Sequence, residues 1–471
     1  MASPRLKIWL LYVVLVSALG GFLFGFDSGV ISGCEKAIQN EYSLSAFKHG
    51  FTVSVALIGT VIGAFGIGRP SDRFGRKLSL IVLGFLFLIS AAGCAFAPDW
   101  LTLVVMRGIG GLAIGGASVV VPLYIVEIAP GPVRGRLVAL NQFNIVLGIL
   151  VSFISNYLVA LAIDHQTWVW TSCERLANWF VSVPMGAESI KWRLMLGVES
   201  FPAILFILLL FTIPESPRWL VRAGRKDEAL GVLNAIGDPQ PAATLANIEE
   251  TLASVRTGQN IPLFQKKYLW PIFLAWAVAM FNQLSGINAI NYYAPRIFEQ
   301  FIGPHAALAA TVGLGSVNLV FTILAFFFID RYGRRVLLMF GALGTTLMHF
   351  IAAWQISLGE NASAPIAIAA ILGFIAFFGV SQGAVIWVFI SEIFPNAVRA
   401  KGQALGSFTH WVMCTLISWT FPIVATLSPS SGSYAFAFFG CMTMLQFFFA
   451  WKLMPETKGG TIETLEKEIL K

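Results

Sequence analysis

The sequence predicts an all-α membrane protein with twelve transmembrane helices, arranged as two six-helix bundles. Apolar residues make up 57% of the 471 residues and charged residues only 12%, and the mean hydropathy is +0.77. A soluble protein of this length could not bury so much apolar surface. Windows of about 20 apolar residues, long enough to cross a bilayer, recur along the chain and are expected to be helical, because strand edges find no hydrogen-bond partner in hydrocarbon. They lie at 9–31, 50–68, 78–97, 101–126, 137–162, 194–213, 268–295, 305–329, 336–356, 364–394, 402–427 and 433–454.

The basic residues predict on which side of the membrane each loop lies. If the N-terminus is cytoplasmic, the loops on that side carry 24 of the 31 Lys and Arg, whereas the opposite loops carry six and Arg107 falls inside the fourth span. This bias is typical of cytoplasmic loops. We therefore expect a multi-pass protein of the cell membrane with both termini in the cytoplasm. The same loops account for the net charge of +7, so no nucleic acid is expected as a partner.

A duplication divides the chain into two similar halves. The polar interval 214–266 separates six spans from six, and three short motifs occur in the same order in each half. The pairs are DRFGRK at 72–77 with DRYGRR at 330–335, EIAPGPVRG at 127–135 with EIFPNAVRAKG at 392–402, and PESPR at 214–218 with PETKG at 455–459. The predicted domains are an N-terminal bundle at 1–213, a cytoplasmic linker with short amphipathic helices at 214–266, a C-terminal bundle at 267–454 and a cytoplasmic tail at 455–471.

These motifs and their order resemble the sugar porter family of the major facilitator superfamily over residues 15–459. The resemblance implies two bundles that rock about a central site and import a monosaccharide, a hexose in the first place or else a pentose. An enzyme is not expected, because the chain has no Gly-rich phosphate loop, metal-spaced His and Cys set or nucleophile elbow. No cofactor or metal is expected. The expected partners are a monosaccharide, protons and membrane lipid, with the monomer as the functional unit.

The repeated loop motifs predict a charged gate on the cytoplasmic side. Gly75 and Gly333 allow tight turns between the spans, and the nearby charges can cap helices or form ion pairs. The seven-residue spacing offers Glu127 to Arg134 as one such pair and repeats in the second half. Alternatively, the charges are solvated and only orient the loops, contributing about 0–1 kcal/mol per pair. By the resemblance, the gate consists of Asp72, Arg76, Glu127, Arg134, Glu215, Asp330, Arg334, Glu392, Arg399 and Glu456.

Amide side chains inside the spans predict the substrate site. A sugar needs groups that both donate and accept hydrogen bonds, and an apolar plate for its C–H faces. The seventh span, with MFNQLSGINAINYYAP at 280–295, is polar and interrupted by glycine, which is typical of a transporter's central cavity. Alternatively, such amides only tie helices together, at about 0.6 kcal/mol per interaction. By the resemblance, the hydrogen-bonding contacts are Gln142, Gln283, Asn288 and Asn318, the ring platform is Trp387, and the lining residues are Ile145, Ile149, Tyr292 and Phe378.

Two further predicted sugar contacts depart from the family pattern. Asn282 stands where many relatives have Gln, so its side chain is one methylene shorter. His410 stands where relatives commonly have Asn or Gln. A neutral imidazole still donates and accepts, and it can tune substrate choice or pH dependence. The alternative for His410 is a structural histidine bonded to a neighbouring helix.

Asp27 and Arg107 are the remaining charges that we predict inside the membrane. Topology gives them similar depth, so they can neutralise each other. By the resemblance they are the proton-coupling pair of sugar:H⁺ symporters, which makes symport the favoured mechanism. The alternatives are a structural ion pair in a facilitative uniporter and, more remotely, a sugar sensor that does not transport.

Overall fold

The computed structural model describes residues 4–130, 133–165, 186–257, 262–395, 398–428 and 431–458. The regular elements in these ranges are all helices, and twelve segments are long and apolar enough to cross a membrane. They are Ile8–Glu41, Ala46–Gly66, Arg76–Ala95, Trp100–Ile128, Arg134–Asp164, Ala187–Leu210, Lys266–Glu299, Pro304–Ile329, Arg334–Ser357, Ala364–Glu392, Arg399–Ala425 and Ser431–Lys452. The predicted fold class and all twelve spans are confirmed. The first helix runs ten residues past its predicted end at 31, because its polar last turns are paired with neighbouring helices.

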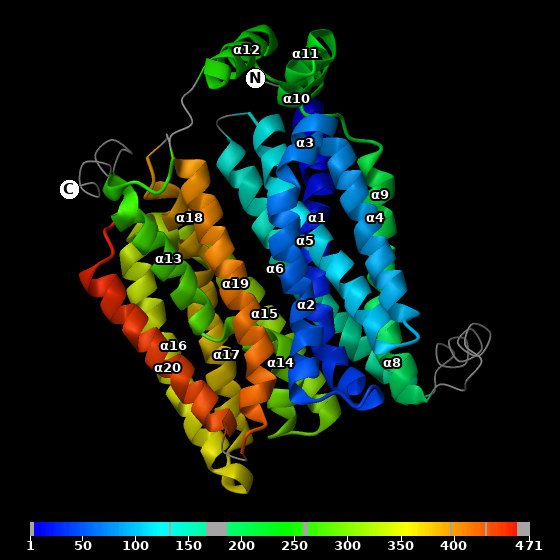
Figure 1. Cartoon of the computed structure of the whole chain (residues 1–471), viewed down its shortest axis with the longest axis vertical. Helices are drawn as coiled ribbons and strands as arrows, with labels where there is room; N and C mark the ends of the chain where they lie inside the picture. Colours follow the sequence, from blue (N-terminus) through cyan, green and yellow to red (C-terminus); the bar gives the residue numbers. More distant parts are fainter. Residues whose placement is uncertain are drawn as a thin grey trace. The chain divides into compact units, whose positions relative to one another are not determined.

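Most spans are single helices (Figure 1). They are α1 (Pro4–Glu41), α2 (Ala46–Gly66), α4 (Arg76–Ala95), α5 (Trp100–Ile128), α6 (Arg134–Asp164), α15 (Pro304–Tyr332), α16 (Arg334–Ser357), α19 (Arg399–Ala425) and α20 (Ser431–Lys452). We call the end of a span opposite the side of the N-terminus its outer end, which the charge bias predicts to be extracytoplasmic.

Three spans are split into two helices each. The pairs are α8 (Ala187–Gly197) with α9 (Ser200–Leu210), α13 (Leu269–Leu284) with α14 (Ile287–Glu299), and α17 (Ala364–Val380) with α18 (Gln382–Glu392). The break before α14 follows from Gly286, whose φ of 79° is left-handed, a conformation that glycine adopts without steric cost. A Cβ at this position would also lie 2.4 Å from the ring of Phe439. The glycine-containing bend predicted in the seventh span is thus present.

The chain forms two compact units, and they do not coincide with the two halves of the sequence. The first unit contains Met1–Ser28, Ile58–Ser152 and Arg193–Asn260. The second contains Gly29–Leu57, Phe153–Trp192 and Ile261–Lys471. The second unit therefore includes the outer ends of α1, α2 and α6 together with the second half of the chain. The predicted domain boundaries at 213 and 267 stay a prediction.

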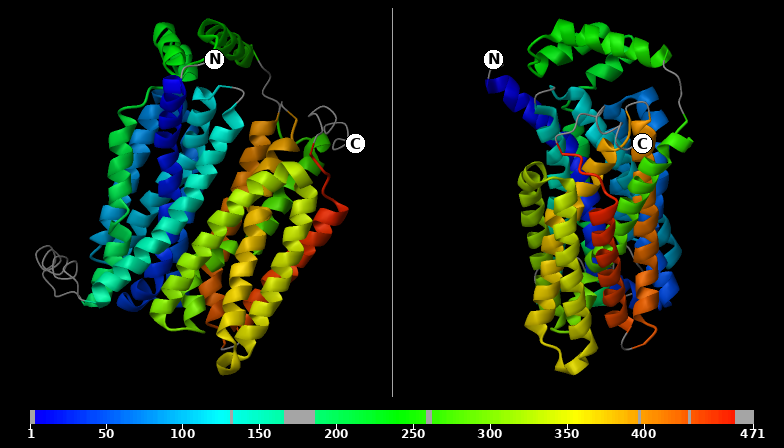
Figure 2. Two further views of the ribbon diagram at one scale, coloured as in Figure 1. Left: turned by 180° about the vertical axis from the view of Figure 1, so that it is seen from behind. Right: turned by 90° about the vertical axis from the view of Figure 1, so that its left-hand side faces the viewer.

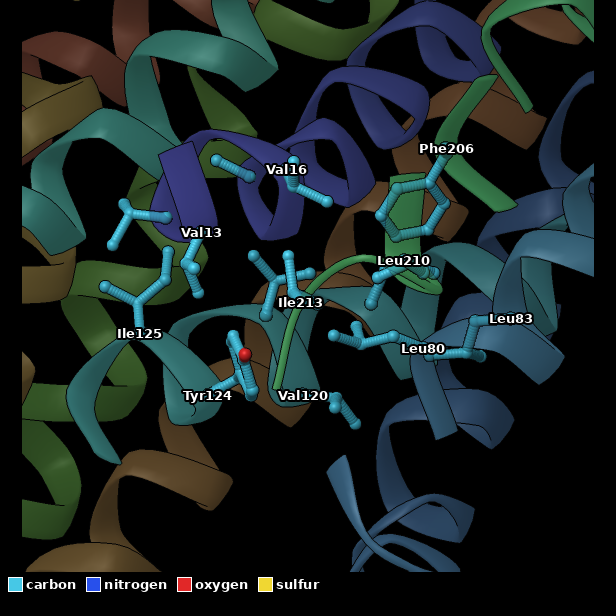
Figure 3. Packing of buried hydrophobic residues seen from close by; sticks show 14 of the residues in the cluster. Val13, Val16, Leu80, Leu83, Val120, Tyr124, Ile125, Phe206, Leu210 and Ile213 are labelled. Carbon is cyan, nitrogen blue, oxygen red and sulfur yellow. The ribbon is translucent and has the colours of Figure 1, made fainter. Parts of the chain in front are cut away.

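The first unit is held by an apolar core of small and large side chains from α1, α4, α5 and α9 (Figure 3). Phe206 of α9 and Tyr124 of α5 are fully buried there. At Gly25 and Gly148 the backbones of α1 and α6 approach so closely that an added Cβ would lie about 2 Å from the facing carbonyl oxygen. This approach holds the segment around Asp27 firmly against α6.

The polar interval contains short helices. These are α10 (Pro217–Arg222), α11 (Lys226–Ala235) and α12 (Pro241–Thr257). Ser216 caps α10, because its hydroxyl accepts from the backbone N–H of Trp219. The three helices pack on one another and lie beyond the ends of the long helices of the first unit (Figure 2). Two 3₁₀ turns (Lys266–Tyr268 and Gly359–Asn361) and α3 (Gly68–Phe74) complete the regular elements.

Candidate substrate and proton sites

Asp27 of α1 and Arg107 of α5 form the ion pair that their depth predicts. An Oδ1 to Nη1 distance of 3.4 Å joins them, and only 4% of each side chain is exposed. Gly110 leaves room for the carboxylate, because an added Cβ there would lie 2.7 Å from Asp27 Oδ2. A buried guanidinium next to a buried carboxylate keeps either charge from being left unpaired.

A second buried carboxylate belongs to the same site. Glu199 lies at the break between α8 and α9, is 3% exposed, and interacts electrostatically with both Asp27 and Arg107. The expectation that Asp27 and Arg107 are the only intramembrane charges is therefore wrong. Glu199 lies inside the predicted span 194–213, so counting the charges in that span would have found it.

A network of amides forms around the break in the seventh span. Asn288 donates to Gln283 Oε1 at 2.6 Å, and Gln283 donates to Asn282 Oδ1 at 3.0 Å. Asn282 in turn donates to the backbone oxygen of Gln382 at 3.3 Å, where α17 gives way to α18. The two helix breaks are thus joined by side-chain amides, and Asn282 and Gln283 are almost fully buried.

His410 of α19 joins this network beside the predicted ring platform. Both of its ring nitrogens lie 3.2 Å from Gln283 Nε2, and its ring centroid is 4.8 Å from that of Trp387. Trp387 is 37% exposed, in contrast to the buried amides. The structure therefore brings four predicted sugar contacts together beside a partly exposed indole.

The other predicted contacts of the second half lie on neighbouring helices. Asn318 of α15 is 3.6 Å from the position of a Cβ at Gly379 of α17 and accepts from Thr322 at 3.5 Å. Phe378 and Tyr292 are buried, at 8% and 5% exposed. In the first unit, Gln142, Ile145 and Ile149 follow one another along α6 at helical spacing and are partly exposed.

Each unit contains one of the two charged loop clusters. In the first, Arg76 binds both carboxylate oxygens of Glu127 at 2.9 Å, and Asp72 pairs with Arg76 at 3.1 Å. Glu215 accepts from the backbone N–H groups of Arg76 and Lys77, at the start of α4. Burial raises the pKa of Glu215 above its usual value, against the opposing effect of these hydrogen bonds.

The second unit repeats this arrangement. Arg334 binds Glu392 at 3.2 and 2.9 Å, and Glu456 accepts from the backbone N–H groups of Arg334 and Arg335. The side chain of Asp330, which was predicted to belong here, lies outside the described residues. Thr457 donates to Glu392 at 2.5 Å.

The partners predicted from the seven-residue spacing are wrong. Arg134 donates to the backbone oxygen of Ala129, and Arg399 donates to that of Phe394. The carboxylates at Glu127 and Glu392 are bound instead by the arginines of the D-R-x-G-R loops. The reason is geometric: the loop arginine starts the next helix and points at the carboxylate, whereas the downstream arginine turns back to free carbonyls.

Twelve spans, a broken polar helix and a buried ion pair are the features of a secondary membrane transporter. The described residues contain no group of three or more His, Cys, Asp or Glu that could hold a metal ion. A family model for sugar (and other) transporters matches residues 13–469. The chain belongs to this sugar transporter family, within the major facilitator superfamily, and is a transporter rather than an enzyme.

Individual relatives are similar in sequence to this protein over nearly the whole chain. The D-xylose-proton symporter of Escherichia coli K12 is 36% identical, covering 96% of this chain and 94% of the relative. The arabinose-proton symporter of Bacillus subtilis is also 36% identical, covering 97% and 95%. Among solved structures, the inward-open xylose transporter of E. coli matches with a TM-score of 0.83 at 34% identity, over 98% of this chain and 99% of that one.

Proposed function

We propose that this protein imports a monosaccharide together with a proton, by alternating access. The observation that carries the proposal is the buried group of Asp27, Arg107 and Glu199. One guanidinium balances one carboxylate, so the charge of the second carboxylate is uncompensated unless it binds a proton. The site therefore favours a bound proton, and any movement that exposes it to water favours release. The relatives described as sugar-proton symporters support the same mechanism.

The sugar would bind to the amides of the seventh span. Asn282, Gln283, Asn288 and His410 offer donors and acceptors, and Trp387 offers its face to the ring. Gln142, Ile145, Ile149, Asn318, Tyr292 and Phe378 complete the proposed contacts. The proposed substrate is a hexose or a pentose, and the relatives described as transporters of xylose and arabinose support a pentose. Competition by glucose, galactose and xylose against a labelled substrate decides between them.

The two loop clusters would act as the cytoplasmic gate. Each joins the start of one span to the end of another through an arginine–glutamate pair, buried in the first unit and partly exposed in the second, so each half is stiff on this side. We further propose that the protein lies in the cell membrane with both termini in the cytoplasm, functions as a monomer and has no partner besides substrate, protons and lipid.

Uptake into proteoliposomes tests the coupling. With an imposed pH gradient, acidic outside, the wild type should accumulate sugar above equilibrium. Asp27→Asn should abolish accumulation but retain exchange of sugar for sugar, because exchange requires no net proton movement. Asp164→Asn, at a partly exposed ion pair with Lys191 away from the proposed sites, is the control and should accumulate sugar like the wild type. A wild type that never exceeds equilibrium would instead be a uniporter.

A further inference from the structure

A second buried cluster of charges lies at the outer ends of α1, α2 and α14. His49 Nε2 of α2 is 2.8 Å from Glu35 Oε2 of α1. Arg296 of α14 reaches the same carboxylate, with Nη2 2.8 Å from Oε2 and Nε donating to Oε1 at 2.9 Å. The side chains of Glu35 and His49 are each 1% exposed. The three residues belong to the same compact unit, and the predicted proton and sugar sites leave them unused.

The cluster joins helices from the two halves of the sequence. Glu35 and His49 come from the first two spans, whereas Arg296 follows the break in the seventh span. Arg296 also donates to Gln39 of α1 at 2.6 Å, and Lys36 pairs with Glu299 at 2.7 Å on the exposed side. In a transporter that opens alternately, these contacts must break before the outer side can open.

The buried arrangement offers no acceptor, among the described residues, for a proton on His49 Nδ1. With its proton on Nε2, the ring can direct this N–H toward Glu35, and Nδ1 is then the unprotonated nitrogen of the ring. Nδ1 has no hydrogen-bond partner among the described residues. A second proton on Nδ1 would bury an N–H without an acceptor, and it would add a positive charge beside an ion pair that is already balanced.

Opening reverses this balance. When α14 withdraws, Arg296 leaves Glu35, whereas His49 stays beside Glu35 because both are on first-half helices. Water then reaches the pair, and the imidazolium becomes the natural partner of the carboxylate. Arg296 and a proton on His49 thus compete for the same acceptor.

We infer that Glu35, His49 and Arg296 form a second proton-binding site, on the outer side, at which an external proton displaces Arg296 and favours opening. The inference rests on the proposed alternating access, and it does not depend on Asp27. By linkage, the state that binds the extra proton is favoured at low pH. A low external pH therefore favours the outward-open state, in which the sugar binds from the outside.

The charged and aromatic groups near His49 come from α1, α2, α14 and α19. They are Glu35 and Lys36 on α1, the exposed Lys48 next to it on α2, Tyr293, Arg296 and Glu299 on α14, and the uncharged Trp419 and Phe421 on α19. The ring of Tyr293 meets that of His49 edge-on at 5.9 Å. The ordinary pKa values of lysine, arginine and tyrosine lie above pH 8 and those of carboxylates below pH 5.5. His49 is the histidine of this set, and histidine is the side-chain type whose ordinary pKa lies within this interval.

Distances between spin labels test the inference without any sugar. Labels at Asn40→Cys on α1 and Ala306→Cys on α15, in a chain whose native cysteines are replaced, report on the outer side in lipid nanodiscs. For the wild type, the ratio of open to closed populations should rise several-fold from pH 8 to pH 5.5. One linked proton limits the rise to about tenfold per pH unit. His49→Gln should remove this pH dependence.

Three further variants keep the result decisive. Glu35→Gln and Arg296→Met each lose the ion pair, so both should be open at both pH values. His305→Gln, at an exposed histidine of the second half, should respond like the wild type. A wild type without a pH response, or His49→Gln with an unchanged response, overturns the inference. If His49→Gln does not fold, Arg296→Met decides: a closed outer side at pH 8 in that variant also overturns it.

Discussion

Arg76 and Glu127 are joined by two parallel hydrogen bonds of 2.9 Å, from Nε to Oε2 and from Nη2 to Oε1. Both side chains are buried, at 7% and 3% exposed, and Ser216 donates to the same carboxylate at 2.5 Å. The contact joins the first residue of α4 to the last turn of α5 and to the cap of α10. One carboxylate therefore fixes three segments that are far apart in the sequence.

Replacing this arginine by lysine tests the geometry rather than the charge. Arg76→Lys keeps the positive charge but cannot make both hydrogen bonds, so one buried carboxylate oxygen loses its partner. We expect a loss of about 1–3 kcal/mol in stability, seen as a lower melting temperature in detergent, and a slower initial uptake rate at unchanged protein level.

The matched control is an exposed pair of the same geometry. Arg225 binds both oxygens of Glu228, but about half of each side chain is exposed. Arg225→Lys should leave both melting temperature and uptake close to those of the wild type, because water solvates the freed oxygen. Equal effects of the two substitutions on melting temperature and uptake would show that burial of the ion pair is not the cause of the loss.

The amide network predicts a separation between affinity and stability. Asn288→Ala removes the donor to Gln283 Oε1 and one proposed sugar contact, so the KM for sugar should rise by roughly tenfold or more. Asn156→Ala removes another amide, whose Nδ2 donates to the backbone oxygen of Val30 at 3.0 Å. That variant should lose stability while its KM stays unchanged. A similar KM in both variants would mean that Asn288 only ties helices together.

The close contact between α2 and α19 predicts a variant that binds but does not transport. A Cβ at Gly50 would lie 2.1 Å from the backbone oxygen of Trp419, so Gly50→Val forces the two outer ends apart. Sugar binding by calorimetry should persist, whereas uptake should fall about tenfold or more, because the outer side cannot close. Gly313→Val is the control, since nothing lies within 4 Å of its Cβ position. Normal uptake by Gly50→Val would argue that this contact is not needed.

Hydropathy and charge predicted the fold because both act locally along the chain. Each span needs its own apolar length, and the break in the seventh span needs its own glycine, Gly286. The ion pair of Asp27 and Arg107 could also be predicted, because the topology of the spans places these two residues at a similar depth in the membrane although they are distant in sequence.

Partner choice was harder to predict, because it depends on which helices meet. The spacing from Glu127 to Arg134 suggested a pair, yet Arg76 takes the carboxylate from another helix. Glu35, His49 and Arg296 lie beyond or near the ends of predicted spans, where polar residues are ordinary. Only their tertiary arrangement distinguishes them from solvated charges.

The break at Gly286 begins α14, a helix of 13 residues with a kink at Tyr293. Asn288 is in its first turn and Arg296 in its last, on opposite sides of this kink. A sugar bound at Asn288 therefore acts on the same short helix as Arg296, the arginine of the outer-side cluster. Sugar binding and closure of the outer side are then coupled through one helix. The empty and the sugar-loaded carrier therefore change conformation at different rates.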